Sequence, residues 1–390
     1  MGTTFKDRTA IVGIGWTEYS RASGKSTLHL ADEACKKAIE DSGLRVRDID
    51  GVVTFNVNDS VSPQWVAASL GLPELRYHLE RWGGGTSAPA MVADAAMAVA
   101  CGLADNVVVF RSMNGRSGRR PGGSGEHPAP RGEDQFLIPY GWTSFVHACA
   151  IFARRHMVLY GTRPEHFGAV TIAARKHGAL NERAQLRKPI TMQDYLNSRM
   201  VADPFRLLDI CLETDGACAV VVTSAERARN LKHRPVYIMA AAMGGGPKVS
   251  GFSPNTAGFL RTPSHGDTYA KYVAPHLFGM AGIAPKDVDV AELYDEMTFA
   301  TIFQLEDYGF CKKGEGGPFV EGGRIELGGE LPVNTHGGFL SEGYIHGLNH
   351  VVEAVQQLRG EAGLRQVKDA EIALSTGVGL TVGGALLLRR

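Results

Sequence analysis

The sequence has no excess of either charge, because 41 lysines and arginines balance 41 aspartates and glutamates. Without a net positive field to gather phosphates, nucleic acid is excluded as a principal partner. The 6 cysteines include no C-x-x-C pair, so we expect neither disulfides nor a structural zinc, as in a reducing compartment. The first residues lack an apolar signal core, and Asp94 and Asp105 interrupt the longest weakly polar stretch, 91–110. We therefore expect a cytoplasmic protein with no membrane span.

What is present is the composition of a globular enzyme. Of 390 residues, 44% are hydrophobic and 21% are charged, which is typical of soluble proteins with a sizeable core. This length accommodates two domains of ordinary size. The 48 glycines exceed the usual share. They predict tight turns and places where the backbone closely approaches another segment or a ligand.

Hydrophobic periodicity predicts alternating strands and helices, and therefore an α/β fold. Strands are expected at 9–15, 51–55 and 106–110, and helices at 28–42, 63–70 and 87–101. The helix at 87–101 carries small residues on all sides, so we expect it to be buried all round. A polar, glycine-rich segment follows, with helical stretches near 142–159 and 164–177.

A pattern in the first half of the chain recurs in the second half. Residues 34–52 give a helix, a glycine cap, Asp-Ile-Asp and a strand, and residues 274–291 repeat that order with Asp-Val-Asp. Runs of glycine at 83–85 and 337–338 each precede a helix and a strand. We expect two similar halves, 1–230 and 231–390, with a cap or loop domain at about 113–212 inserted into the first.

Three glycine-rich blocks occur in a characteristic order with this repeat. They are Asp215-Gly216-Ala217 before a strand, Asn334-Thr335-His336-Gly337-Gly338 followed by Gly343, and Gly377-Val378-Gly379 followed by Gly383-Gly384-Ala385. On these blocks the sequence resembles the thiolase superfamily, in its sterol-carrier and lipid-transfer-like branch, over essentially the whole chain. The resemblance implies a thiolase fold of five layers, αβαβα, built from two similar halves, and a homodimer formed through the first half.

The departures from the family pattern concern the reactive residues. Gly85 stands where a thiolase carries its nucleophilic cysteine, and Ser375 aligns with the second cysteine. Tyr344 stands at the position of the catalytic histidine, and Tyr294 at that of the asparagine or histidine of a second block. Condensation through an acyl-enzyme needs a thiolate, so we expect no thiolysis by the standard route. We also expect the missing side chain at Gly85 to leave room for a bulky tertiary carbinol.

Two phenols in place of imidazole or amide groups suggest a different reaction. A phenol, with a pKa of about 10, is better matched than imidazole to exchanging a proton with an alcohol or an enolate. The sequence resembles the steroid side-chain-cleaving aldolases of this superfamily. That resemblance implies retro-aldol cleavage of a 3-hydroxyacyl-CoA, a 17-hydroxy steroid C22 acyl-CoA, to a 17-keto steroid and propionyl-CoA. It also implies an OB-fold partner of the DUF35 type and a heterotetramer, while no cofactor or metal is expected.

The resemblance also assigns roles within the site. Tyr344 is expected to be the base and Tyr294 the acid, although the reverse assignment stays open. His336 is expected either to hydrogen-bond a catalytic tyrosine or to brace its turn. Amides near Gly85 and Gly379 are expected to hold the thioester oxygen. The competing functions are a non-catalytic acyl-CoA or lipid carrier and a degradative thiolase with an atypical nucleophile.

Other polar residues receive plainer interpretations. Asp295 and Glu296 follow a strand end, where carboxylates commonly cap a helix. His346 and His350 have the spacing of a zinc pair, but no Glu or Cys completes a ligand set. The arginines at 116, 119 and 120 lie in a glycine-rich loop. Arginine forks suit phosphate oxygens, so they could meet the coenzyme A phosphates, but such a loop more often forms a solvated surface or a partner contact.

Overall fold

The computed structural model describes residues 5–118, 135–136, 138–142, 144–247, 266–377 and 380–390. Within these residues a nine-stranded mixed sheet has the order β3-β2-β4-β7-β1-β8-β11-β10-β9. The first-half strands are β1 (Thr9–Trp16), β2 (Gly51–Asn56), β3 (Tyr77–Trp82), β4 (Asn106–Asn114) and β7 (Asp215–Ser224). The second-half strands are β8 (Val236–Gly245), β9 (Val290–Glu292), β10 (Ile372–Gly377) and β11 (Val382–Arg389).

The strand order repeats between the two halves of the sheet. The run β2-β4-β7-β1 in one half corresponds to β9-β10-β11-β8 in the other, and β3 is the additional edge strand of the first half. The halves join through antiparallel pairing of β1 with β8, which covers only Ala10 with Tyr237 and Ile11 with Val236. The duplicated topology explains the recurring sequence pattern, while the boundary at 230/231 stays a prediction.

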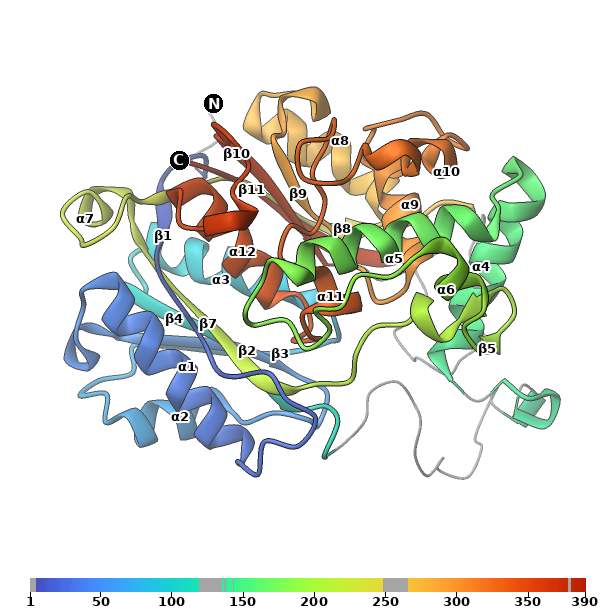
Figure 1. Ribbon diagram of the computed structural model, residues 1–390. Helices are drawn as coiled ribbons and strands as arrows, with labels where there is room; N and C mark the ends of the chain where they lie inside the picture. The colour runs from blue at the N-terminus through green and yellow to red at the C-terminus, as the bar shows by residue number, and fades with distance from the viewer. Residues whose placement is uncertain (1–4, 119–134, 137, 143, 248–265, 378–379) are drawn as a thin grey trace.

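Helices lie in three layers around the two parts of the sheet (Figure 1). The outer layers contain α1 (Thr27–Ser42) and α2 (Pro63–Leu70) on one side, and α8 (Ala270–Ala281) and α9 (Thr298–Asp307) on the other. The central layer contains α3 (Ser87–Ala100) and α12 (Leu348–Arg359), each of which contacts strands of both halves. The small side chains of α3 are largely buried because the helix is enclosed between two layers of strands. Met97 is exposed, so the prediction of burial on every side is confirmed only in part.

The segment between β4 and β7 forms a separate lobe beside the layers (Figure 1). It contains α4 (Phe145–Tyr160), α5 (Pro164–Ala179), α6 (Met192–Leu196) and the short strands β5 (Met200–Ala202) and β6 (Phe205–Arg206). The face of α5 meets α9 and α11 (Gly338–Ser341). The inserted segment therefore packs directly over the second half, close to the glycine-rich turn at 334–338.

Short elements and side-chain clamps complete the architecture. The remaining helices are α7 (Ala225–Ala228) and α10 (Gly316–Phe319). Asp215 accepts hydrogen bonds from the backbone amides of Ser23, Arg116 and Ser117 and so ties two loops to the start of β7. Near the two ends of the chain, the Arg389 guanidinium pairs with Asp7 at 3.0 Å. No helix within the described ranges has the length and apolarity needed to cross a bilayer.

Candidate active site

The two tyrosines identified from the sequence meet at the centre of the molecule. Tyr294 follows β9 and Tyr344 follows α11, and their hydroxyl oxygens lie 2.6 Å apart in a hydrogen bond. Their rings are close to perpendicular, with centroids 6.2 Å apart. Tyr294 is buried and Tyr344 is partly buried. Residues 50 positions apart are thus held as one hydrogen-bonded unit.

Backbone hydrogen bonds to neighbouring side chains fix the tyrosine pair. The Tyr294 amide donates to Thr376 Oγ1 at 2.9 Å, and its carbonyl accepts from Gln304 Nε2 at 2.8 Å. The Thr376 hydroxyl in turn donates to Gln304 Oε1. The Tyr344 amide donates to Thr214 Oγ1 at 3.0 Å. These three residues carry no local sequence signal and were not predicted, because each acts on a tyrosine only through the fold.

Gly85 provides the space that Tyr294 occupies. A Cβ atom placed on Gly85 would overlap the hydroxyl and ring carbons of Tyr294. The expectation that the missing side chain leaves room for a tertiary carbinol is therefore wrong, since the phenol fills that room. Gly85 and Tyr294 act as a complementary pair, one small and one large. The thioester-binding role assigned to Gly85 stays a prediction, and Gly379 lies outside the described residues.

Burial disfavours the phenolate form of both tyrosines. Burial raises the pKa of Tyr294 well above 10, and the neighbouring Tyr344 and Glu296 raise it further. Burial also raises the pKa of Tyr344, whereas the hydrogen bond between the two hydroxyls and the Arg111 cation act in the opposite direction. A phenolate at either tyrosine would accept a hydrogen bond from the other hydroxyl, and the Arg111 cation favours the anion at Tyr344.

A buried arginine and histidine lie beside Tyr344. The Arg111 guanidinium forms an ion pair with Asp59 and donates to His346 Nδ1 at 3.2 Å from Nε. The His346 ring meets the Tyr344 ring edge-on, with centroids 4.6 Å apart. Burial and the adjacent Arg111 lower the pKa of His346 to about 3, so its imidazole stays neutral. Because Nδ1 accepts from Arg111, the ring proton resides on Nε2.

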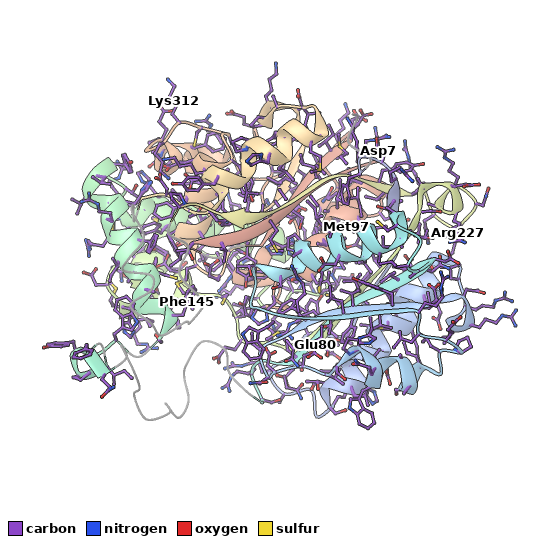
Figure 2. The ribbon with its side chains drawn as sticks, turned by 180° about the vertical axis from the view of Figure 1, so that it is seen from behind. Asp7, Glu80, Met97, Phe145, Arg227 and Lys312 are labelled. Carbon is purple, nitrogen blue, oxygen red and sulfur yellow. The ribbon has the colours of Figure 1, made fainter. Side chains whose placement is uncertain are left out.

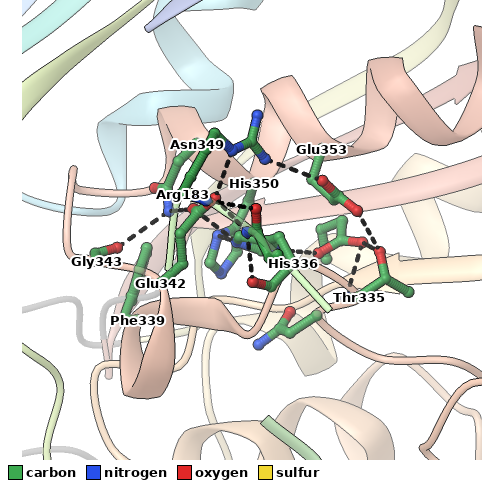
Figure 3. Close-up of polar contacts among 12 residues, drawn as sticks. Arg183, Thr335, His336, Phe339, Glu342, Gly343, Asn349, His350 and Glu353 are labelled. Carbon is green, nitrogen blue, oxygen red and sulfur yellow. Dashed lines mark hydrogen bonds and ion pairs between the residues drawn. The ribbon is translucent and has the colours of Figure 1, made fainter. Parts of the chain in front are cut away.

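His336 lies in a buried network of carboxylates rather than on a tyrosine (Figure 3). Its Nδ1 is 3.0 Å from Glu292 Oε2, and its Nε2 is 3.1 Å from His350 Nδ1. Burial disfavours the imidazolium, but Glu342 and Glu292 outweigh burial and raise the pKa of His336 to about 9. Of the two expectations for His336, these contacts support bracing of the turn.

The same network links the second-half turn to the inserted segment. Arg183, which follows α5, reaches Glu342 at 3.0 Å and Glu353 at 3.2 Å. His350 contacts the Leu293 carbonyl at 2.9 Å, directly before Tyr294 in the chain. The two histidines once considered as a zinc pair, His346 and His350, therefore belong to different networks. Buried charges here position the strand end that carries Tyr294.

The two carboxylates after Tyr294 have different surroundings. Asp295 accepts a hydrogen bond from the Phe339 amide at 2.9 Å and so caps the start of α11. It therefore caps a helix, as its position after a strand end suggested. Glu296 caps no helix, and neither of its carboxylate oxygens has a hydrogen-bond partner in the described part of the chain. Ser375 is fully buried, and its hydroxyl also lacks a partner among the described residues.

Comparison with curated proteins finds relatives that match almost the whole chain. A 17-hydroxy-3-oxo-4-pregnene-20-carboxyl-CoA lyase from Mycobacterium tuberculosis is 46% identical, covering 97% of this chain and 99% of the relative. A steroid side-chain-cleaving aldolase from Thermomonospora curvata is 41% identical, with 97% of each chain covered. An acetyl-CoA acetyltransferase from Methanothermobacter thermautotrophicus is 32% identical over 96% of this chain and 97% of its own length.

A family model and solved structures agree with these relatives. The model described as thiolase C-terminal domain-like matches residues 256–387. A structure described as an Ltp2-ChsH2(DUF35) aldolase superimposes with a TM-score of 0.92 at 41% identity, covering 99% of both chains. Human mitochondrial 3-ketoacyl-CoA thiolase gives a TM-score of 0.70 at 13% identity and covers 98% of both chains, a likeness of fold alone.

Proposed function

The chain belongs to the thiolase superfamily, and we propose that it is a lyase that cleaves the side chain of a steroid acyl-CoA by a retro-aldol reaction. The predicted thiolase fold is confirmed by the structural likenesses. The proposed substrate is a 17-hydroxy steroid C22 acyl-CoA, and the products are a 17-keto steroid and propionyl-CoA. The two lyase and aldolase relatives, at 46% and 41% identity, support this substrate class.

One observation carries the proposal: the phenol of Tyr294, hydrogen-bonded to Tyr344, fills the space over Gly85. A thiolase-type acyl-enzyme requires a nucleophile at that position, and this chain has none there. A retro-aldol cleavage requires only a base for the hydroxyl proton and an acid for the enolate. The hydrogen-bonded phenols meet both requirements without a covalent intermediate or a cofactor.

The proposed mechanism moves one proton. Tyr344, as phenolate, takes the proton from the 17-hydroxyl group, and the bond between the α and β carbons breaks to give the ketone and a thioester enolate. Tyr294 donates its proton to the α carbon of the enolate and then regains a proton from Tyr344 through their hydrogen bond. Arg111 favours the anion at Tyr344. The atoms balance, since the proton of Tyr294 ends on the α carbon of propionyl-CoA and the hydroxyl proton of the substrate replaces it on Tyr294 by way of Tyr344.

The first prediction tests the tyrosine pair. Tyr344→Phe and Tyr294→Phe each keep the ring and its packing but remove one hydroxyl. We expect each to lower kcat by about 10²–10⁴-fold, the range for loss of general acid–base catalysis. The measurement is propionyl-CoA release from the steroid thioester by the complex with the DUF35-type partner. Ser375→Ala is the matched control, because its hydroxyl is buried and lies outside the proposed proton path.

The outcomes separate the competing functions. Near wild-type rates in both phenylalanine variants would exclude this mechanism, and loss of activity in Ser375→Ala would move the acid role to that hydroxyl. Binding of the acyl-CoA by the wild-type complex without product would identify a carrier. Thiolysis products in place of a ketone would identify a degradative thiolase with an atypical nucleophile.

We further propose that the active form contains a DUF35-type OB-fold partner and a homodimer of this chain. The support for the partner is the similarity to the Ltp2-ChsH2(DUF35) aldolase structure. The support for the dimer is β3, the edge strand of the sheet, whose outer face carries Trp82 at 68% exposure. Met97 on α3 is also exposed, and Figure 2 shows Met97 and Glu80 on the side turned toward the viewer. Two copies of each chain would give the expected heterotetramer.

A further inference from the structure

The proposed cleavage places a negative charge on the thioester oxygen of the substrate. When the bond between the α and β carbons breaks, its electron pair passes into the thioester and leaves an enolate oxygen. A hydrogen-bond donor aimed at such an oxygen lowers the barrier, and loss of one donor typically costs about 10²–10³-fold in kcat. Tyr344 and Tyr294 are occupied with the two proton transfers, so the enolate oxygen requires a donor of its own.

His346 lies directly beside the tyrosine pair. Its ring meets the Tyr344 ring edge-on, with centroids 4.6 Å apart. The next residue, Gly347, packs against the other tyrosine, since a Cβ atom placed on it would lie 3.3 Å from Cδ2 of Tyr294. His346 has a positive φ of 50°, a left-handed conformation that strains residues other than glycine and that is concentrated at functional sites. The fold therefore holds this imidazole next to both phenols in spite of backbone strain.

Arg111 determines which ring nitrogen of His346 can donate. Its Nε and Nη2 lie 3.2 and 2.7 Å from Nδ1 of the imidazole. Arg111 is fully buried, forms an ion pair with Asp59, and has its guanidinium 4.4 Å from the centroid of the Phe55 ring. A guanidinium has no acceptor atom, so Nδ1 accepts and the ring proton resides on Nε2. Because Arg111 cannot turn away without leaving the Asp59 charge unpaired in the interior, the fold fixes this tautomer.

The Nε2–H group of His346 is available to a ligand. Among the described residues Nε2 has no hydrogen-bond partner, whereas Nδ1 has Arg111. The side chain is 3% exposed, and Nε2 is not one of the polar atoms that the described part of the chain encloses without a partner. Tyr344, against which the ring lies, is likewise only partly buried. An accessible donor and an accessible phenol therefore lie side by side, within reach of one bound thioester.

We propose that His346 donates a hydrogen bond from Nε2–H to the thioester oxygen of the substrate and stabilises the enolate oxygen that forms there. This inference rests on the proposed function and adds a third residue to its machinery. In a 3-hydroxyacyl thioester only the α carbon separates the carbon that bears the hydroxyl group from the thioester carbon. The hydroxyl group can therefore meet Tyr344 while the thioester oxygen meets the neighbouring imidazole. His346 keeps its proton throughout, and the proton transfers of the tyrosines are unchanged.

A neutral imidazole suits this role better than an imidazolium. An imidazolium could give its proton to the enolate oxygen, which would compete with delivery of a proton to the α carbon by Tyr294. Burial and the adjacent Arg111 prevent this, since they lower the pKa of His346 to about 3. Neutral histidine polarises a carbonyl oxygen in the same way in enzymes that form an enediolate.

The test compares two ligands that differ in one oxygen. S-propyl-CoA is the thioether analogue of the product propionyl-CoA and lacks its carbonyl oxygen. In the complex with the DUF35-type partner, calorimetry should show that His346→Phe raises the Kd of propionyl-CoA about 3–10-fold, the value of one hydrogen bond. The Kd of S-propyl-CoA should change by less than about twofold. We also expect kcat for the steroid thioester to fall about 10²–10³-fold.

His346→Gln is the matched variant, because its amide nitrogen can take the place of Nε2 and its backbone strain is the same as that of phenylalanine. It should recover part of both the Kd and the kcat. Imidazole ¹⁵N spectra of the wild type give a readout that needs no variant to fold: the Nε2 signal of His346 should shift with propionyl-CoA but not with S-propyl-CoA.

Three results would overturn the inference. They are an equal loss of affinity for both ligands in His346→Phe, which indicates a structural residue, a kcat within about threefold of the wild type, and an Nε2 signal that responds equally to both ligands. If the wild-type complex cleaves no steroid thioester, the proposed function fails. The two Kd values and the Nε2 signal then still decide whether His346 binds the carbonyl oxygen.

Discussion

Gly85 and Tyr294 depend on each other at the scale of single residues. Because a Cβ at position 85 overlaps the Tyr294 phenol, we expect Gly85→Ala to displace the phenol and to abolish steroid cleavage. Overpacking of this kind typically costs about 1–3 kcal/mol of stability. Urea unfolding measures that cost.

The double variant Gly85→Ala with Tyr294→Asn is the control. A smaller side chain at 294 relieves the overlap, so the Ala substitution should cost almost nothing in that background, although activity stays absent. An equal cost in both backgrounds would show that the overlap does not determine the requirement for glycine. The comparison is a double-mutant cycle, which isolates the pairwise term.

His336 couples the stability of the protein to pH. Its pKa is raised to about 9 in the folded state, from about 6.5 in the unfolded chain. The stabilisation is therefore complete below about pH 6.5 and is lost as the pH rises through about 9. At about 1.4 kcal/mol per pKa unit, the loss is on the order of 3 kcal/mol. We expect Tm to fall between pH 7 and 10 in the wild type, and the slope to be smaller in His336→Gln. If Tm depended equally on pH in both proteins, a group other than His336 would be responsible for the pH dependence.

At the scale of elements, the turn at 334–338 positions the strand end that carries Tyr294. Asn334 has a positive φ of 51° and exchanges two hydrogen bonds with the Leu293 backbone, at 2.7 and 2.8 Å. Asn334→Ala loses both bonds and strains the backbone, and we expect a cost of about 2–4 kcal/mol in unfolding free energy. Asn334→Gly loses the same bonds without the strain, so it should be about 1 kcal/mol less damaging. The reverse order would exclude backbone strain as a contributor.

Local sequence patterns predicted the elements well where one periodicity dominated. The helix expected at 63–70 is α2 with the same bounds, and the helix expected at 87–101 ends one residue earlier, at Ala100. Strand β3 escaped prediction because its alternation of half-buried and exposed residues includes His78, Glu80 and Arg81, which weaken the hydrophobic signal. The two tyrosines were found only because each stands at a family position with a different residue.

Long-range partners could not be predicted in the same way. Arg111 meets His346 across 235 positions, and Thr376 meets Tyr294 across 82. Neither contact leaves a periodicity or a motif in the sequence. The first depends on how the two halves pack, and the second on how two distant segments of the second half pack. Glu296 is a similar case, because a carboxylate after a strand end is usually a cap. Only its burial without partners distinguishes it from Asp295.

At the scale of the whole molecule, the edge strand β3 determines the expected dimer. We expect Trp82→Glu to shift the chain toward monomers, because it places a charge on the apolar part of an unpaired strand edge. Light scattering gives the mass directly. Leu364→Glu is the matched control, since Leu364 is exposed at 81% but belongs to the connection between α12 and β10 in the second half of the chain. Equal masses for both variants would place the interface elsewhere.

The ion pair between Asp7 and Arg389 also bears on the order of the two halves along the sequence. The two ends of the duplicated architecture meet at one place, and the connection between α7 and β8 passes through exposed residues such as Lys232. We therefore expect the fold not to depend on which half comes first in the chain. A circular permutant that starts at Lys232, with the old ends joined by a short flexible linker, should reach the same fold with the tyrosine pair intact. In that case the order of the two halves along the sequence is inherited from the duplication and is not required by the fold.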